Sequence, residues 1–275
     1  MKRCFAILAA GLLAACGGSN SSSVNAPPLT TFTYSNPAPP TTTQTTTAME
    51  ASTSVGQVVV SASQGDAASA SGAPELADSI GEQALGAAAM AAPRTPTSEA
   101  ARQLAVKTRS GALETGCYTV TGDTLTYNNC SYSSSGYTYT ANGTLTATAT
   151  NVTWNLTFTV SYTSSSETFN YDGNWTGNMT YTSTSTGGTI SGSCLSQDSG
   201  NFSGSGESGN FAWTVGLDFL GITYSTSCDS GGGITGGTLE IRANESGTLD
   251  LFGYKQAGLE IIWSGCDAVT VASSN

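Results

Sequence analysis

Five carboxylic side chains in the alternating part of the chain are the residues whose chemistry could support catalysis. They are Asp172, Glu207, Asp218, Glu240 and Glu260. Glycoside hydrolysis needs only two carboxyl groups, so these residues raise the hypothesis of a glycan-cleaving protein. Most of them fall at outward strand positions or in turns, and the sequence pairs none of them. We therefore expect no catalytic residues, carboxyl groups that face water, and a chain that is not an enzyme.

The chain contains no histidine. This excludes Ser-His-Asp and Cys-His nucleophiles, imidazole zinc sites and the usual proton shuttle near neutral pH. One stretch resembles the first half of an EF-hand calcium loop, but Ser183 stands where the twelfth residue of such a loop is glutamate. The residues of that stretch are Asp172, Asn174, Thr176, Gly177 and Asn178. We expect strand and turn there, and neither a metal ion nor a cofactor in the protein.

Two cysteines bracket a predicted β-hairpin. Cys117 and Cys130 stand on either side of two short alternating runs that meet at Gly122-Asp123, a Gly-first pair suited to a two-residue turn. With Thr121 opposite Thr124, Tyr118 pairs with Tyr127 and Val120 with Leu125, and both cysteines fall on the other face. They are then diagonal neighbours, which predicts a Cys117–Cys130 disulfide. The sequence does not decide which of Cys194, Cys228 and Cys266 stays unpaired.

The four tryptophans, Trp154, Trp175, Trp213 and Trp263, could form sugar-stacking platforms. Each lies in phase with the apolar residues of its own predicted strand. We therefore expect all four to be buried in the core of the domain.

The first residues of the chain have the pattern of an export signal. Lys2 and Arg3 precede a short apolar run that ends in Leu13-Ala14-Ala15-Cys16. This ending resembles the lipobox of bacterial lipoproteins, whose cysteine is lipidated when the signal is removed. The resemblance implies a signal peptide over residues 1–15 and lipid on Cys16. Gly17 is not the aspartate that resembles an inner-membrane retention signal, so the resemblance favours the outer membrane, with the lipid anchor as the contact to it.

The net negative charge of the chain argues against one class of partner, nucleic acid. Removal of residues 1–15 leaves six of the eight basic residues against nineteen acidic ones, a net charge of about −13. Such a chain repels nucleic acid, and we expect no nucleic-acid partner. A glycan or a protein remains open as the partner.

Composition divides the mature chain in three. Residues 16–73 are mostly Ser, Thr, Pro, Asn and Gln, which predicts a lipidated, largely disordered tether. Residues 74–110 are rich in Ala with apolar residues at helical spacing, which predicts a helical spacer or docking segment. Residues 111–275 alternate with a period of two, which predicts an antiparallel β domain.

The alternation changes phase near Asn151, which indicates a bulge or turn there. Apolar residues mark strands over 137–149, 152–162, 169–181, 211–219 and 220–224, followed by four shorter pairs of apolar residues up to Val271. Short Gly- and Ser-rich linkers make consecutive strands antiparallel neighbours. We predict an all-β meander closed into a barrel or a sandwich, because closure removes exposed edges.

Together these features predict an outer-membrane lipoprotein with a non-enzymatic binding or structural β domain. The first alternative is a carbohydrate-binding or carboxylate-based glycan-cleaving surface protein. The second is a transmembrane β-barrel with its apolar face toward lipid, for which a lipid tether would be redundant.

Overall fold

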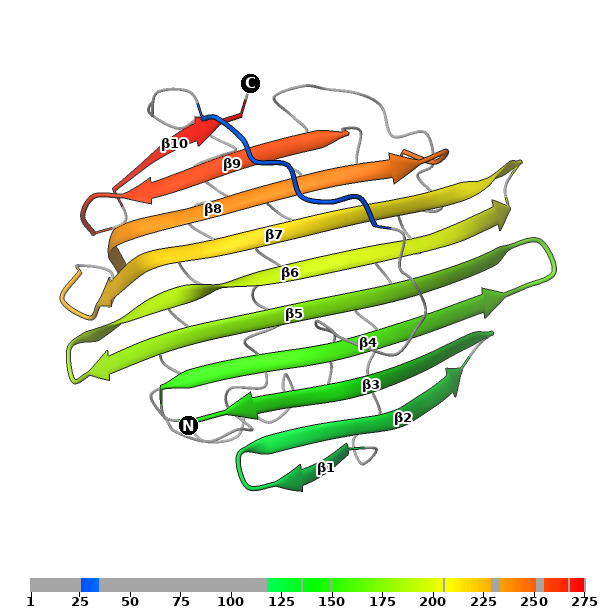
Figure 1. Cartoon of the computed structure of the whole chain (residues 1–275), viewed down its shortest axis with the longest axis horizontal. Helices are drawn as coiled ribbons and strands as arrows, with labels where there is room; N and C mark the ends of the chain where they lie inside the picture. Colours follow the sequence, from blue (N-terminus) through cyan, green and yellow to red (C-terminus); the bar gives the residue numbers. More distant parts are fainter. Residues whose placement is uncertain are drawn as a thin grey trace.

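The computed structural model describes residues 26–34, 118–134, 136–148, 150–204, 206–228, 233–250, 255–266 and 268–274. Within these ranges the chain forms one antiparallel sheet of ten strands in sequence order, a meander from β1 to β10 (Figure 1). The strands are β1 Tyr118–Thr121, β2 Thr124–Ser134, β3 Tyr137–Ala147, β4 Asn151–Thr163, β5 Thr168–Thr184, β6 Gly187–Gly204, β7 Glu207–Ser225, β8 Gly233–Gly247, β9 Gln256–Trp263 and β10 Val269–Ser273.

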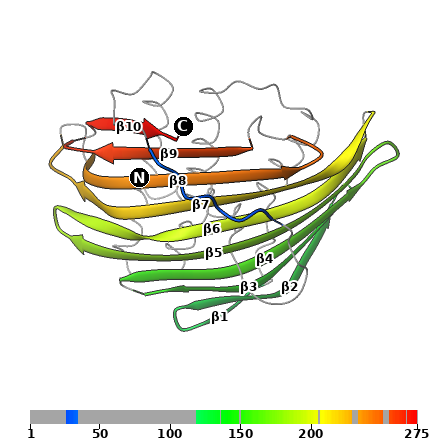
Figure 2. The ribbon, with the colours of Figure 1, turned by 45° about the horizontal axis from the view of Figure 1, so that its top comes forward.

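For the residues that the structure describes, the all-β prediction is confirmed. The sheet is twisted and curved (Figure 2), and no ladder among the described residues joins β1 to β10. The predicted tether, residues 16–73, is described only at residues 26–34, and there the chain is docked on the sheet instead of disordered. The predicted helical segment 74–110 lies outside the described residues.

The two faces of the sheet differ in chemistry. One face, the inner face, carries the buried aromatic and aliphatic residues, in two clusters. The other, the outer face, carries Thr, Ser, Asn and Gln on most strands and is the face seen in Figure 1. Inner glycines make room for large rings on neighbouring strands: a Cβ on Gly177 would lie 2.0 Å from Trp154, and one on Gly200 would lie 2.5 Å from Phe211. The core therefore packs large side chains against small ones.

The register of the first hairpin is as predicted. Tyr118 pairs with Tyr127, Val120 with Leu125, and Thr121 with Thr124. Gly122 has a φ of 57°, as the first position of a type II′ turn requires. The phase change near Asn151 is a turn between β3 and β4.

Bulges produce two departures from the predicted alternation. In β2 the register shifts between Tyr127 and Cys130, and Asn129 takes a φ of 49°. The extra residue turns Cys130 onto the inner face, where it is 2% exposed, so the expectation that it lies on the other face was wrong. In β7 a second bulge at Leu220 absorbs the phase change that predicted a separate strand, and Leu220 points outward.

Candidate functional site

Three of the five carboxyl candidates come together on the outer face. Asp218 of β7 pairs with Glu240 of β8, and Glu240 pairs with Glu260 of β9. These three residues, called the carboxylate row, stand side by side on adjacent strands, where directly opposite side chains are about 5 Å apart at Cβ. Asp172 lies two strands away on β5, and Glu207 begins β7 at its turn from β6. Nothing in the sequence marked this row, because its members are twenty or more residues apart.

One arginine offsets part of the charge of the row. Arg242 lies two residues after Glu240 on the same face of β8; its guanidinium forms an ion pair with Asp218, and its Nε lies 3.4 Å from Glu240 Oε1. All three side chains are roughly a quarter exposed, so the pairs are neither fully solvated nor buried. The site keeps an excess of negative charge, because one guanidinium faces three carboxylates.

A segment near the start of the chain crosses this site. Residues 26–34, called the strap, run over the outer face from β7 to β10, where Tyr34 forms a β-bridge with Ser274 (Figure 1). The Tyr34 hydroxyl donates a 2.7 Å hydrogen bond to Glu240 Oε1. Burial first, and then this hydrogen bond and the charge of Glu240, raise the pKa of Tyr34 well above its ordinary value of 10.0.

Two glycines make sockets for apolar strap residues. Gly216 and Gly258 pair with Arg242 from either side, so they flank it on β7 and β9. A Cβ on Gly216 would lie 2.4 Å from Leu29 Cδ1, and one on Gly258 would lie 2.8 Å from the Phe32 ring. Neither glycine has a positive φ, so space and not backbone conformation requires glycine at these positions.

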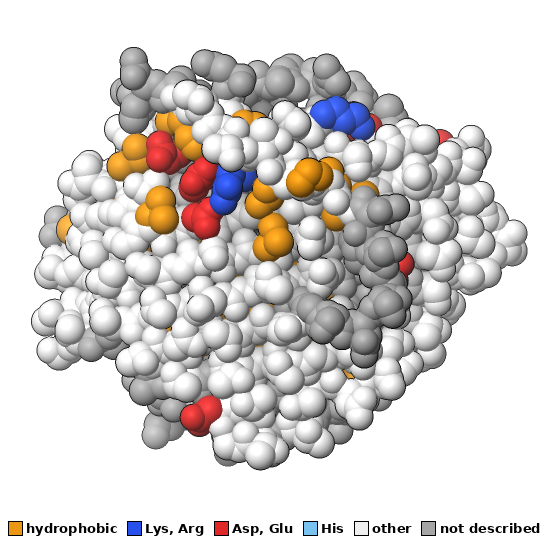
Figure 3. All heavy atoms as spheres, in the orientation of Figure 1, with side chains coloured by type: hydrophobic (Ala, Val, Ile, Leu, Met, Phe, Trp, Pro, Cys, Tyr) orange, Lys and Arg blue, Asp and Glu red, His pale blue; other side chains and the backbone are white. Residues whose placement is uncertain are grey.

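Polar contacts complete the seat of the strap. The Thr214 hydroxyl donates to the Pro27 carbonyl, and Asn244 Nδ2 donates to the Pro28 carbonyl at 2.6 Å and to Thr30 Oγ1 at 2.7 Å. Thr214 is 1% exposed and Asn244 5%, although both lie on the outer face. Figure 3 shows the charged and hydrophobic side chains gathered on this half of the face, while the other half is nearly free of them.

The inner face holds a second polar cluster, which the sequence did not predict. Asp198 of β6 is fully buried. Its Oδ1 accepts hydrogen bonds from the Tyr171 hydroxyl at 2.5 Å and from Trp175 Nε1 at 2.8 Å, and its Oδ2 accepts one from Ser196 Oγ at 2.5 Å. Three donors are therefore directed at one carboxyl group in an apolar setting, which stabilises the cluster and fixes the orientation of both rings.

All four tryptophans are buried, as predicted, with exposures of 1 to 4%. Trp213 lies between two inner-face carboxyl residues, because its neighbours in register are Asp198 and Glu245. Glu245 is 4% exposed. For Asp198 and Glu245 the expectation of water-facing carboxyls was wrong: both stand at inner positions of their strands.

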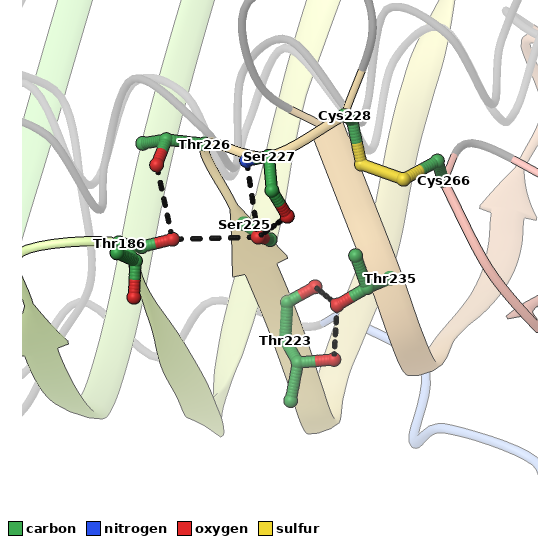
Figure 4. Close-up of a disulfide and its surroundings, with 8 residues drawn as sticks. All are labelled: Thr186, Thr223, Ser225, Thr226, Ser227, Cys228, Thr235 and Cys266. Carbon is green, nitrogen blue, oxygen red and sulfur yellow. Dashed lines mark hydrogen bonds between the residues drawn. A yellow bond between two sulfur atoms is a disulfide. The ribbon is translucent and has the colours of Figure 1, made fainter.

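Cys228 and Cys266 form a disulfide that joins the end of β7 to the turn between β9 and β10 (Figure 4). Beside it, the Thr226 hydroxyl donates to the Thr186 carbonyl at 3.2 Å, and the hydroxyls of Thr223 and Thr235 lie 3.0 Å apart. Cys194 is present as a thiol. Cys130 is disulfide-bonded, while Cys117 and Cys16 lie outside the described residues, so the Cys117–Cys130 pair stays a prediction.

The stretch that resembles a calcium loop lies within β5, as strand. Asp172 and Gly177 fall on opposite faces of that strand, since Gly177 packs against Trp154 on the inner face. The part of the chain that the structure describes contains no cluster of acidic or cysteine side chains suited to a metal ion.

Within the same residues, no helix is long and apolar enough to cross a bilayer. Comparison of the chain with protein-family models, with curated proteins and with solved structures gives no match.

Proposed function

We propose that the protein is an outer-membrane lipoprotein, anchored through Cys16, whose β domain is a non-enzymatic binding or structural module. The non-enzymatic part of the proposal is carried by one observation: three of the carboxyl groups are already engaged in contacts with other side chains of the protein. Glu240 accepts a hydrogen bond from Tyr34 and forms an ion pair with Arg242, which also pairs with Asp218. Asp198 accepts hydrogen bonds from three donors. A glycosidase needs one carboxyl poised to donate a proton and another facing the sugar, both in reach of substrate.

The surface that we assign to binding is the outer face of β2 to β6, called the hydroxyl face. Among its described residues Asp172 is the one charged side chain, and the rest are Thr, Ser, Asn or Gln apart from Leu195. Cross-strand pairs join parts of it: Asn151 Nδ2 donates to Asn178 Oδ1 at 2.7 Å, and Asn170 Nδ2 donates to Asn201 Oδ1 at 3.1 Å. A face with many hydroxyl and amide groups and few charges suits a neutral, hydrogen-bonding partner, such as a glycan or an uncharged protein surface.

Closure of the sheet into a barrel or a sandwich remains part of the proposal. It is supported by the burial of the inner face, where Leu145, Phe169, Ile222 and Leu239 are completely buried. Leaving such a face in water would cost roughly 25 cal/mol for each Å² of apolar surface, and closure is one arrangement that avoids this cost.

Binding by the hydroxyl face is tested with charge substitutions on the full-length protein. Asn155→Lys with Thr176→Lys places two cations on exposed, paired positions of β4 and β5. We expect this variant to lose most of its co-sedimentation with insoluble envelope polysaccharide that has been freed of lipid and protein, while Ser166→Lys, in an exposed turn, keeps it. Equal retention by all three proteins would contradict binding by this face.

Catalysis is tested with the carboxylate row. We expect no release of reducing sugars from envelope polysaccharide by the full-length protein. Release that Glu240→Gln or Asp218→Asn abolishes, with the fold intact, would establish the glycan-cleaving alternative.

A further inference from the structure

Docking of the strap shortens the stretch of chain that separates Cys16 from the β domain. Cys16, the residue we propose to be lipidated, is followed by nine residues before the docked strap begins at Ala26. An extended chain spans at most about 3.5 Å per residue, so the lipid and the strap can be no more than about 35 Å apart. If the strap did not dock, the next described residue would be Tyr118, and 101 residues would stand between the lipid and the domain.

The outer-face residues under the strap match the shape and the hydrogen-bonding groups of residues 26–34. Gly216 and Gly258 leave the space that Leu29 and Phe32 fill, and three hydrogen bonds from Thr214 and Asn244 hold the strap backbone and Thr30. Tyr34 adds a hydrogen bond to Glu240 and the bridge to Ser274. Contacts therefore run along the whole strap, from Pro27 to Tyr34.

The surface around the strap also differs from the rest of the outer face. Leu220 of β7 is 53% exposed, and it is the one large hydrophobic residue on the surface of the described part of the chain that is more than partly exposed. Ile262 of β9 pairs with Thr238, the partner of Leu220 on β8, and is half-buried. Apart from Leu195 on β6, the large apolar residues of the outer face thus lie in the half that the strap crosses (Figure 3).

We propose that the docked strap holds the β7–β10 half of the outer face beside the lipid surface, so that the domain lies close to the membrane instead of standing on a long stalk. This rests on the proposed lipid anchor at Cys16. The chain between Tyr34, beside β10, and Tyr118, at the start of β1, then does not set the distance to the membrane, whatever its length.

Two matched insertions separate these arrangements. A flexible Gly-Ser segment of about 30 residues, whose ends are on average about 30 Å apart, is placed either between Val24 and Asn25, before the strap, or between Thr46 and Thr47, after it. The full-length acylated protein carries a fluorescent amino acid at the exposed Thr176 and is reconstituted in vesicles with an acceptor dye on the lipid headgroups. Energy transfer to the headgroups reports the distance between the domain and the membrane.

We expect the insertion before the strap to remove roughly half or more of the energy transfer, and the insertion after the strap to leave it unchanged. The double variant Leu29→Asp with Phe32→Ser should lower the transfer in the same way, because it releases the strap. Equal responses to the two insertions in proteins that carry the lipid would overturn the strap proposal and leave the anchor intact. Failure of the parent protein to acquire lipid, with Cys16→Ser behaving identically, would overturn the anchor itself.

Discussion

The phenol of Tyr34 donates a 2.7 Å hydrogen bond to Oε1 of Glu240, although 206 residues separate the two in the chain. This contact joins the strap to the eighth strand of a sheet that is otherwise built from neighbours in sequence. Since the seat of the strap needs β7, β8 and β9 in register, the strap can dock only after these strands have paired.

Alkaline pH should release the strap. Burial and the Glu240 carboxylate raise the pKa of Tyr34 above its ordinary value of 10.0, so the folded state favours the neutral phenol. The stabilisation is fully present below pH 10 and falls as the pH rises above it, because the unfolded state then loses a proton that the docked Tyr34 retains. In the absorbance of tyrosinate, Tyr34→Phe should lack one of the tyrosines that ionise only well above pH 10. An unchanged number of late-titrating tyrosines in this variant would argue against a buried, bonded Tyr34.

The close packing of Leu29 on Gly216 predicts that substitutions at these two residues have coupled effects on the free energy of unfolding. Gly216→Ala should destabilise the protein by about 1 kcal/mol, because the new Cβ would lie 2.4 Å from Leu29 Cδ1. In a Leu29→Ala background the same change should cost little, giving a coupling energy of about 1 kcal/mol in urea unfolding. Gly236→Ala, on β8 and next to Thr223, is the control and should not couple to Leu29. Additive effects of Gly216→Ala and Leu29→Ala would contradict the socket.

The buried carboxyl group of Asp198 should be required for stability. In Asp198→Asn one oxygen becomes an amide nitrogen, which cannot accept the hydrogen bonds from Tyr171, Trp175 and Ser196 together. We expect a loss of about 1 to 3 kcal/mol in the free energy of unfolding, with a change in tryptophan fluorescence. Asp172→Asn is the control: burial raises the pKa of Asp172, so removing its charge should not destabilise the fold at neutral pH. Equal stabilities of the two variants would contradict the burial of the Asp198 carboxyl group in this hydrogen-bonded cluster.

Peptide mapping checks how the cysteines are paired. Without reduction, Cys228 should be recovered linked to Cys266, Cys130 to Cys117, and Cys194 as a thiol. The Cys228–Cys266 bond spans 38 residues, so Cys228→Ala with Cys266→Ala should cost about 4 kcal/mol in the chain-entropy account. Recovery of Cys194 linked to Cys228 or Cys266 would contradict the positions of β6 and the β9–β10 turn.

The sequence predicted the fold best where large apolar residues alternate. Trp154, Trp175 and Trp213 were placed on the correct face by counting in twos, and the first hairpin was placed in register by its turn. β6 was missed, because the inner positions of this strand include Gly192, Ser196, Asp198 and Gly200 and show little apolar alternation. Those small and polar residues face the large rings of β5 and β7, so the signal for β6 lies in its neighbours.

The site was less predictable than the fold. The carboxylate row depends on the register of three strands, and one bulge in β7 or β8 placed elsewhere would separate its members. The strap has the composition of a disordered linker, and its docking depends on sockets that are more than 180 residues away in the chain. Local composition cannot report such a contact, because the apolar surface that the strap buries belongs to two distant parts of the sequence.

Lipidation of Cys16 can be read from the mass of the N-terminal peptide of the mature protein. The protein is extracted from membranes of an expressing bacterium, digested, and its first peptide analysed by mass spectrometry. We predict an N-terminal peptide that begins at Cys16 and carries covalently attached lipid on this cysteine. A mature chain that begins at another residue, or an unmodified Cys16 in the membrane fraction, would contradict the lipoprotein account.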